Sequence, residues 1–339
     1  MRASGTTILK SPLVLLAVYA ALLAGRSLEA QQSSIDPSLD IKITSSMDGS
    51  PQPAILYVPP GAAAGDSGQR VPLVVFLHSW SADYTGAIPV VAESKKRGWA
   101  FVAPNFRGPN ETPQACASDL AVQDILDSVD YAKRMARVDE KRIYLVGSSG
   151  GGHMALLMAT RAPGLWSAVS AWVPITDLAA WYEFSKATSS RYYPMMDKCF
   201  GGSPDAPERA AEYRRRSSLF YLARAKGVRI AIDSGLRDGH AGAAVPLSQT
   251  LLAFNELARA NGLPEKALSL EEIDIMTRES RIPPELAREK QEEPGRQQAV
   301  LFRRTAGPVR LTVFDGGHAV DIQTSFRWLD SLDSTTPSR

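Results

Sequence analysis

Cysteine and histidine are scarce in this sequence, which has two cysteines and four histidines among 339 residues. They occur without the Cys-x-x-Cys or His-x-x-x-His spacing that is typical of metal ligands. The sequence therefore predicts no metal site, and no motif in it indicates a bound cofactor.

An excess of charge of either sign is also missing, since 38 Lys and Arg are balanced by 36 Asp and Glu to a net charge of +2. Proteins that bind polyanions usually carry a basic field, so we expect no nucleic-acid partner. A hydrophobic content of 44% is that of an ordinary globular protein with one large core. There is no internal repeat, and the oligomeric state is left open.

Long apolar runs are absent except near the N-terminus. Arg2 and Lys10 precede the uncharged run Pro12–Ala24, and the small residue Ala30 follows. A basic start, a short apolar middle and a small residue before the cut are the plan of a secretory signal, here residues 1–30. Because a membrane span needs ~20 apolar residues, we expect a secreted or periplasmic protein without a membrane anchor after cleavage. An uncleaved anchor is the alternative.

The sequence contains two cysteines, Cys116 and Cys199, whose expected state depends on whether the chain is exported. In an oxidising compartment they can form one disulfide. The alternative is a pair of unrelated buried thiols.

From Val71 onward, short apolar runs typical of buried strands alternate with segments of helical periodicity. This alternation predicts a mostly parallel sheet with helices on both faces. The expected strands are 41–47, 54–57, 71–77, 99–103, 143–146, 168–172, 228–232 and 309–314, and the expected helices are 90–97, 119–135, 246–260 and 319–332. We expect one domain, residues 31–339, with two insertions: an aromatic-rich lid over 176–222 and a charged excursion over 264–298.

The stretch on which the chemistry depends follows the expected strand 143–146. It reads Gly147-Ser148-Ser149-Gly150-Gly151 and leads directly into a helix. Gly-x-Ser-x-Gly at a strand-to-helix turn is the nucleophile elbow, in which the serine adopts a strained backbone and its neighbours must lack side chains. We predict that Ser149 is a nucleophile. The alternative is a glycine-rich turn that only packs a helix on the sheet.

A serine nucleophile needs a general base, and His318 is the candidate. It follows the last expected strand, in a loop at the carboxyl edge of the sheet, where reactive groups collect. His78 precedes the serine, which is the wrong chain order for the base of this fold class. We expect His153 to pack inside the elbow helix and His240 to line the pocket or lie in solvent.

The base needs an acid to orient it, and Asp238 is the first candidate because it lies in the loop after the strand 228–232. Asp233 and Asp177 are the alternatives. The developing oxyanion needs two N–H donors. One is expected from the Gly150 amide, and the other from Trp80 or Ser79 in the loop after strand 71–77, with Trp80 preferred.

These features together resemble the catalytic domain of the prolyl-oligopeptidase type of α/β-hydrolase, a group that also contains secreted esterases. The resemblance covers residues 71–332. It is carried by the His78-Ser79-Trp80 loop, the Arg107-Gly108 loop, the Gly147–Gly151 elbow, the Gly235-x-x-Asp238 turn followed by Val245-Pro246, and Gly316-Gly317-His318. It implies the α/β-hydrolase fold and the triad Ser149, Asp238 and His318.

The sequence departs from that family in two places. His240–Ala244 is inserted between the acid and the Val-Pro pair, and residues 31–70 are far too few for the propeller domain of the oligopeptidases. We therefore expect a secreted serine hydrolase that cleaves small-molecule or polysaccharide esters through an acyl-enzyme. A peptidase acting on short peptides and a non-catalytic binding scaffold are the alternatives.

Overall fold

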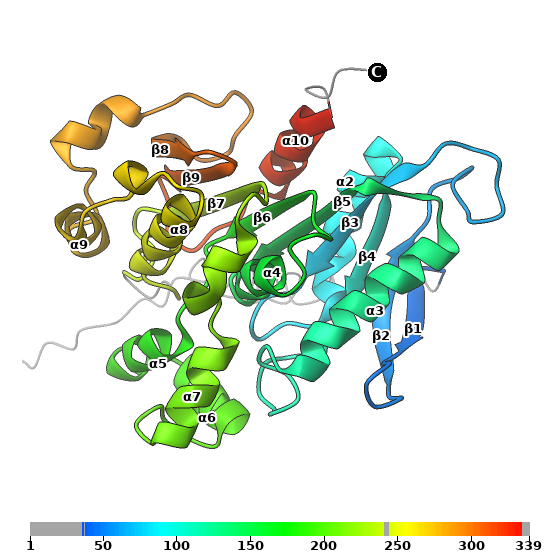
Figure 1. Ribbon diagram of the computed structural model, residues 1–339, viewed down its shortest axis with the longest axis horizontal. Helices are drawn as coiled ribbons and strands as arrows, with labels where there is room; N and C mark the ends of the chain where they lie inside the picture. Colours follow the sequence, from blue (N-terminus) through cyan, green and yellow to red (C-terminus); the bar gives the residue numbers. More distant parts are fainter. Residues whose placement is uncertain (1–35, 37, 241–243, 334–339) are drawn as a thin grey trace, which may run out of the picture. The chain divides into compact units, whose positions relative to one another are not determined.

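The strands and helices assemble around one sheet in the computed structural model, which describes residues 36, 38–240 and 244–333 (Figure 1). The expected signal sequence, residues 1–30, lies outside the described residues. Contacts divide the chain into a unit Met1–Asp36 and a unit Pro37–Arg339, and every element below belongs to the second unit.

The sheet of the described chain has the strand order β1-β2-β4-β3-β5-β6-β7-β9-β8. Neighbours from β4 to β9 run parallel, while β1, β2 and β8 pair antiparallel with theirs at the two edges. It is therefore an open, mostly parallel sheet, as predicted. The strands are β1 Asp40–Thr44, β2 Pro51–Tyr57, β3 Val71–Leu77, β4 Ala100–Pro104, β5 Val138–Ser148, β6 Ala168–Trp172, β7 Ile230–Gly235, β8 Val300–Ala306 and β9 Val309–Phe314.

Helices cover both faces of this sheet. In Figure 1, α3, α4 and α8 lie over one face, whereas α2 and α10, which contact each other, belong to the other. The α-helices are α2 Ile88–Arg97, α3 Asp119–Met135, α4 Gly150–Arg161, α5 Leu178–Ala187, α6 Tyr192–Phe200, α7 Pro207–Arg216, α8 Ser248–Ala260, α9 Leu270–Arg278 and α10 Ile322–Asp333. Short 3₁₀ helices are η1 Tyr84–Ala87, η2 Ser218–Ala225, η3 Pro264–Lys266 and η4 Pro284–Glu289.

The central strands are apolar on both faces because both faces are covered. In β3, Leu73, Val75 and Leu77 belong to the main core, whereas Phe76 stacks on Phe101 with ring centroids 6.4 Å apart. Burial of this kind contributes roughly 25 cal/mol per Å² of apolar surface and fixes the register of each strand. A fixed register in turn fixes where each strand ends, and so where the loops of the carboxyl edge begin.

Helix α3 shows how local sequence sets an element's bounds. The Ser118 hydroxyl accepts a hydrogen bond from the Ala121 amide at 3.1 Å and caps the helix start. Side chains at helical spacing are buried against the sheet, namely Ala121, Ile125, Val129 and Ala132. The predicted range, residues 119–135, is the range observed.

Strand β8 was not predicted. Its sequence includes Arg303 and Arg304, so it does not read as an apolar run. In the structure both guanidinium groups are paired with carboxylates of the charged insertion, Arg303 with Glu293 and Arg304 with Glu289. These ion pairs, with β9 on its inner side, allow a basic segment to complete the edge of the sheet.

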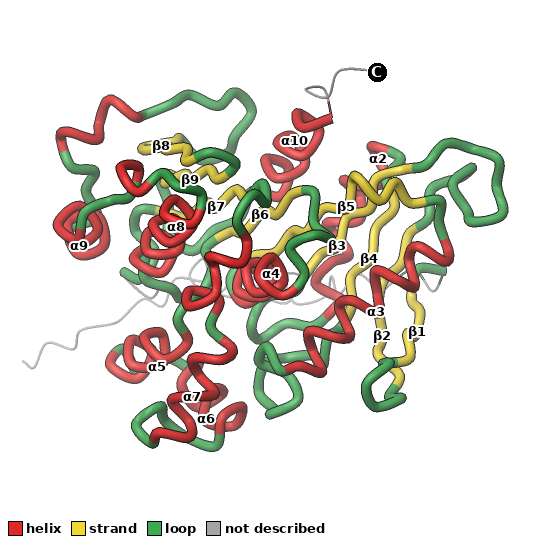
Figure 2. Tube along the Cα trace, viewed as in Figure 1, coloured by secondary structure: helices red, strands yellow, loops and turns green. Residues whose placement is uncertain are grey.

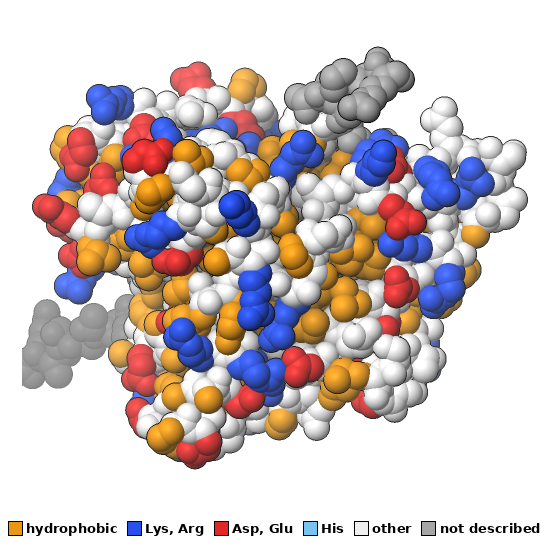
Figure 3. All heavy atoms as spheres, viewed as in Figure 1, with side chains coloured by type: hydrophobic (Ala, Val, Ile, Leu, Met, Phe, Trp, Pro, Cys, Tyr) orange, Lys and Arg blue, Asp and Glu red, His pale blue; other side chains and the backbone are white. Residues whose placement is uncertain are grey.

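The two insertions differ in character. The lid insertion folds into α5, α6 and α7, which pack on one another apart from the sheet (Figure 2), and continues into η2. The 264–298 insertion contains η3, α9 and η4. Within the described residues, none of the helices combines the length and the hydrophobicity that a bilayer span requires. On the face shown in Figure 3, acidic and basic side chains are interspersed.

Candidate active site

Ser149 lies between the end of β5 and the start of α4 with φ 57° and ψ −119°. A non-glycine residue in this region costs on the order of 1–3 kcal/mol and persists only where its surroundings enforce it. Here the Ser149 amide donates to the Trp172 carbonyl at 2.8 Å, and the Ser149 carbonyl accepts from the His153 amide at 2.9 Å. The conformation turns the side chain out of the line of both elements.

The glycines of the elbow are required by close backbone contacts. A Cβ on Gly147 would lie 2.3 Å from the Gly151 carbonyl oxygen, and a Cβ on Gly151 would lie 2.0 Å from the Leu77 carbonyl oxygen. Neither backbone atom can give way without moving β3 or α4. The Gly-x-Ser-x-Gly pattern is therefore a packing requirement of this turn.

Asp238 and His318 are brought together by the loops after β7 and β9. These strands are parallel neighbours, and a Cβ on Gly235 would lie 2.2 Å from the Gly317 carbonyl oxygen, so the two loops cross in close contact. His318 Nδ1 lies 2.8 Å from Asp238 Oδ2. The other carboxylate oxygen accepts from the amides of Gly239 at 3.0 Å and Val245 at 3.2 Å. Asp238 is buried, and both of its carboxylate oxygens have partners.

Packing links the elbow to the histidine loop. The Trp172 carbonyl binds the Ser149 amide, and the Trp172 ring packs on Phe314 with centroids 5.7 Å apart. Ala319, next to His318, packs against the same cluster. Among the described residues the Ser149 hydroxyl makes no hydrogen bond. This does not exclude Ser149 as a nucleophile, because catalytic hydrogen bonds are often long until substrate binds.

The alternative acids are engaged elsewhere. Asp233 forms an ion pair with Arg296 at 2.9 Å, and both side chains are 1% exposed. Asp177 caps α5 by accepting hydrogen bonds from the amides of Ala179 and Ala180. Both carboxylates therefore have structural partners, whereas Asp238 faces the histidine.

The two amides expected to hold an oxyanion are adjacent. A Cβ on Gly150 would lie 2.4 Å from the Trp80 amide nitrogen, so the oxyanion loop contacts the first residue of α4. Neither N–H donates a hydrogen bond to another described residue. The Ser79 hydroxyl is turned toward the Ser148 carbonyl, at 3.2 Å. The amides of Gly150 and Trp80 are therefore free donors at the elbow, and the Ser79 alternative stays open because its amide also donates to no described residue.

His78 supports the oxyanion loop from below. Its ring stacks on Phe106 with centroids 3.9 Å apart, and its two nitrogens lie 3.0 Å from the Ser79 carbonyl and 2.8 Å from the Asn105 carbonyl. Burial lowers the pKa of His78 below its usual value. The residue joins two loops, and both of its ring nitrogens are within hydrogen-bond distance of backbone carbonyls.

The remaining histidines are also held by carbonyls. His153 is buried in α4, where Nδ1 lies 3.2 Å from the Ile175 carbonyl, and burial lowers the pKa of His153 to about 4. His240 Nε2 lies 2.5 Å from the Thr277 carbonyl and ties the acid turn to α9. His153 packs as expected, and His240 has a structural contact that the sequence did not indicate.

Cys116 and Cys199 are bonded to each other, with Cα atoms 6.2 Å apart. The bond joins α6 of the lid insertion to the segment before α3. Asn110 lies in the same segment and was not singled out from the sequence, because an asparagine after a proline reads as a turn residue. Its amide donates to the Trp80 carbonyl at 2.8 Å, a contact that depends on the tertiary fold.

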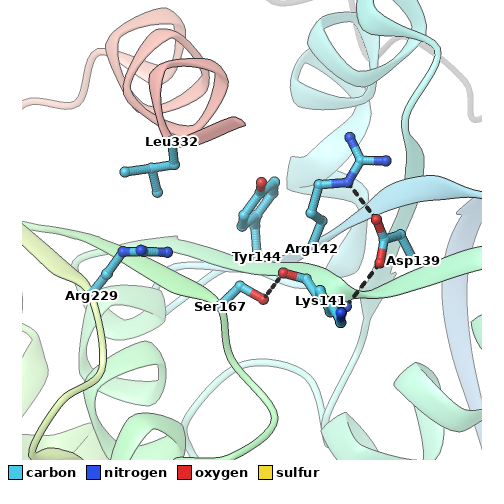
Figure 4. Close-up of a pocket in the computed structure, with 7 residues that line it drawn as sticks. All are labelled: Asp139, Lys141, Arg142, Tyr144, Ser167, Arg229 and Leu332. Carbon is cyan, nitrogen blue, oxygen red and sulfur yellow. Dashed lines mark hydrogen bonds and ion pairs between the residues drawn. The ribbon is translucent and has the colours of Figure 1, made fainter. Parts of the chain in front are cut away.

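A hollow of about 280 Å³ lies at the opposite edge of the sheet, near the start of β6 and β7 (Figure 4). None of the residues discussed above lines it; its walls are Asp139, Lys141, Arg142, Tyr144, Ser167, Arg229 and Leu332. The candidate active site is therefore identified by the chemistry and contacts of its residues, and this hollow is not part of it. Among the described residues, no group of three His, Cys, Asp or Glu side chains is arranged to hold a metal ion.

Comparison with solved structures places the fold. An acylaminoacyl peptidase of Pyrococcus horikoshii superposes with a TM-score of 0.54 at 18% identity over 87% of this chain and 40% of that chain. A puromycin-hydrolyzing peptidase of Mycobacterium tuberculosis gives 0.54 at 18% identity, over 87% and 39%. An acetyl xylan esterase of Paenibacillus sp. R4 gives 0.53 at 17% identity, over 86% and 83%. This chain spans about two fifths of the length of these peptidases, and the likeness establishes the α/β-hydrolase fold.

Comparison with family models gives the classification. The prolyl oligopeptidase family matches residues 87–268, a range that includes the elbow and the acid turn and ends before His318. The match covers more than half of the chain. The chain therefore belongs to the prolyl oligopeptidase family of serine hydrolases.

Proposed function

We propose that this protein is a secreted esterase that works through an acyl-enzyme. Ser149 attacks the carbonyl carbon while His318 takes its proton, and Asp238 holds the imidazole in the tautomer with Nδ1 protonated. The amides of Gly150 and Trp80 hold the oxyanion. His318 then returns the proton to the departing alcohol. In the second half of the reaction His318 takes a proton from water, the water attacks the acyl carbon, and the bond to Ser149 breaks as the proton passes to the serine oxygen.

The observation that carries this proposal is the 2.8 Å contact between His318 Nδ1 and the buried Asp238 carboxylate at the edge of the sheet that also holds the elbow. A carboxylate–imidazole pair on the same sheet edge as a Gly-x-Ser-x-Gly elbow is what a serine hydrolase requires, whereas a scaffold that only binds does not require it. The strained φ of Ser149 adds to this, since such strain collects at functional sites.

We prefer ester cleavage because an acetyl xylan esterase is among the similar structures and superposes on this chain over 83% of its own length. The similar peptidases share the same fold, so a peptidase acting on short peptides is the second candidate. The triad serves either reaction, and the choice depends on the pocket.

A small acyl ester, on a carbohydrate in particular, is the substrate class that we propose. The lid insertion brings Trp181 against Trp80, with ring centroids 4.8 Å apart, and Tyr192 against Trp181 at 5.1 Å. Trp80 and Trp181 are buried against each other, so their faces are not open to a sugar ring, and the carbohydrate class is supported by the similarity to the acetyl xylan esterase. The Cys116–Cys199 bond supports export, because disulfides persist in oxidising compartments.

The test compares hydrolysis of p-nitrophenyl acetate, acetylated xylan and acyl-peptide p-nitroanilides by the purified mature chain. We expect turnover of the esters and little of the anilides. Ser149→Ala should abolish turnover, whereas Ser148→Ala, a change one residue away, should retain it. Faster turnover of the anilides would establish the peptidase, and a folded wild type without either activity would reject the enzyme.

A further inference from the structure

We propose that Asn110 is a positioning residue for the oxyanion hole and that the lid acts through it. Residues 110–117, called here the 110–117 loop, connect the lid helices to Trp80 and act as a brace between them. The inference rests on the proposed function, since it assigns the brace to the same reaction.

Asn110 contacts both ends of this brace. Its backbone N–H donates to the Trp80 carbonyl at 2.8 Å, and its side-chain Oδ1, which holds that backbone in place, accepts from the Cys116 backbone N–H at 2.6 Å. The residue is 1% exposed, so water cannot replace either bond. Fixing the Trp80 carbonyl limits rotation of the backbone at Trp80, whose N–H faces the elbow.

The indole of Trp80 supplies a second restraint from the lid. It is buried against the edge of Trp181 in α5, with ring centroids 4.8 Å apart. Trp181 in turn donates from Nε1 to the Ala244 carbonyl at 2.8 Å. The following residue, Val245, donates to Asp238. The lid therefore contacts the oxyanion loop and the acid turn.

The 110–117 loop contains two residues with a strained backbone. Cys116 and Ala117 have φ angles of 49° and 58°, and each such non-glycine residue is strained. Two lid contacts oppose that strain. The disulfide fixes Cys116 to Cys199 in α6, and Arg216 at the end of α7 donates to the carbonyls of Pro113, Ala115 and Cys116.

The chain of contacts thus runs from α6 and α7 through the strained pair to Asn110, and from Asn110 to Trp80. Arg216 is buried and held by Glu212 in its own helix, so its fork is preoriented toward the loop. Helices that only packed on one another would need none of these contacts to the 110–117 loop. The arrangement indicates that the lid keeps the oxyanion donor in place.

The first experiment measures Asn110→Ala against p-nitrophenyl acetate and against an alkyl trifluoromethyl ketone. The ketone adds to Ser149 and leaves an oxyanion in the hole, so its inhibition constant reports on that hole. Losing one donor outright costs about 10²–10³ in kcat. For a displaced donor we expect kcat to fall on the order of 10-fold with KM little changed. The inhibition constant should rise by a similar factor.

The second experiment tests the lid connection and does not depend on the first variant folding. Cys116→Ser combined with Cys199→Ser should weaken ketone binding in the same way, and adding Asn110→Ala should cause little further loss, because both changes act through one loop. The matched control is Lys198→Gln. It removes an exposed ion pair to Glu111 at 3.1 Å that links the same two segments, and activity should stay within about twofold.

The outcomes separate the two proposals. A wild type that hydrolyses no ester rejects the proposed function. In a second outcome, the wild type is active and the folded Asn110→Ala variant or the double-serine variant keeps the kcat and the ketone affinity of the parent. That result would reject the role of the 110–117 loop in positioning the oxyanion donor. Fully additive losses from the two changes would likewise contradict a single path.

Discussion

At the residue scale, the site depends on which carboxylate faces His318. Asp238 makes that contact, whereas Asp233 neutralises Arg296 and Asp177 caps α5. Three aspartates with the same chemistry thus have three different tasks, and each task is set by the groups that each carboxylate meets.

Replacing these carboxylates by amides should separate the tasks. Asp238→Asn should lower kcat by about 10³–10⁴-fold, because the amide favours the wrong imidazole tautomer. Asp177→Asn keeps a capping oxygen and should change kcat less than twofold. Asp233→Asn leaves the buried Arg296 with Glu293 as its carboxylate partner, at 3.1 Å, so the free energy of unfolding should fall by about 1–3 kcal/mol while the folded enzyme stays active. Steady-state kinetics and urea unfolding of the three variants provide the check, and a stronger kinetic loss for Asp177→Asn would move the acid.

His153 predicts a pH dependence of stability. Its pKa is lowered to about 4 in the folded state, from 6.5, so between these values the unfolded chain binds more protons. The contribution of His153 to the free energy of unfolding is therefore highest above pH 6.5, where His153 is neutral in both states, and it falls progressively as the pH is lowered toward 4. The change amounts to roughly 3 kcal/mol over that window.

The variant His153→Gln lacks this titration and keeps a donor for the Ile175 carbonyl. The difference in unfolding free energy between wild type and variant should therefore change with pH between about 4 and 6.5 and be constant above it. A difference that is flat across the window would show that His153 is accessible to protons in the folded state.

At the element scale, the elbow is the most constrained junction, because β3, β5 and α4 meet there without room for a side chain. Gly151→Ala introduces a Cβ 2.0 Å from the Leu77 carbonyl oxygen. In an open helix the same change would stabilise by about 1 kcal/mol. Here we expect a loss of unfolding free energy of about 1–3 kcal/mol or more, with activity lost in parallel. Gly164→Ala, which meets no atom within 4 Å, is the control, and stabilisation by Gly151→Ala would contradict the packing.

The same scale shows how far the sequence leads. Helix α3 and the elbow are predicted well because apolar periodicity and glycine spacing are local signals. Strand β8 is missed because its arginines are neutralised by an insertion, which no local pattern shows. Asn110 is missed for a related reason, since its partner Trp80 lies thirty positions earlier and is reached only through folding.

At the scale of the whole molecule, the lid insertion is joined covalently to the loop between β4 and α3. The Cys116–Cys199 bond spans a sequence separation of 83 residues. In the chain-entropy account, a loop of this length stabilises the fold by about 4–5 kcal/mol. We therefore expect the double-serine variant to lose about 2–5 kcal/mol in urea unfolding, and the wild type to lose the same amount in reductant. No loss in either case would mean that the lid holds without the bond.

The central claim is that Ser149 is a nucleophile activated by His318, and fluorophosphonate labelling followed by peptide mass analysis tests it most directly. The account predicts one phosphonylated residue, Ser149, and labelling slowed by at least about 10³-fold in His318→Ala. A label on another residue, or an unchanged labelling rate in His318→Ala, would contradict it.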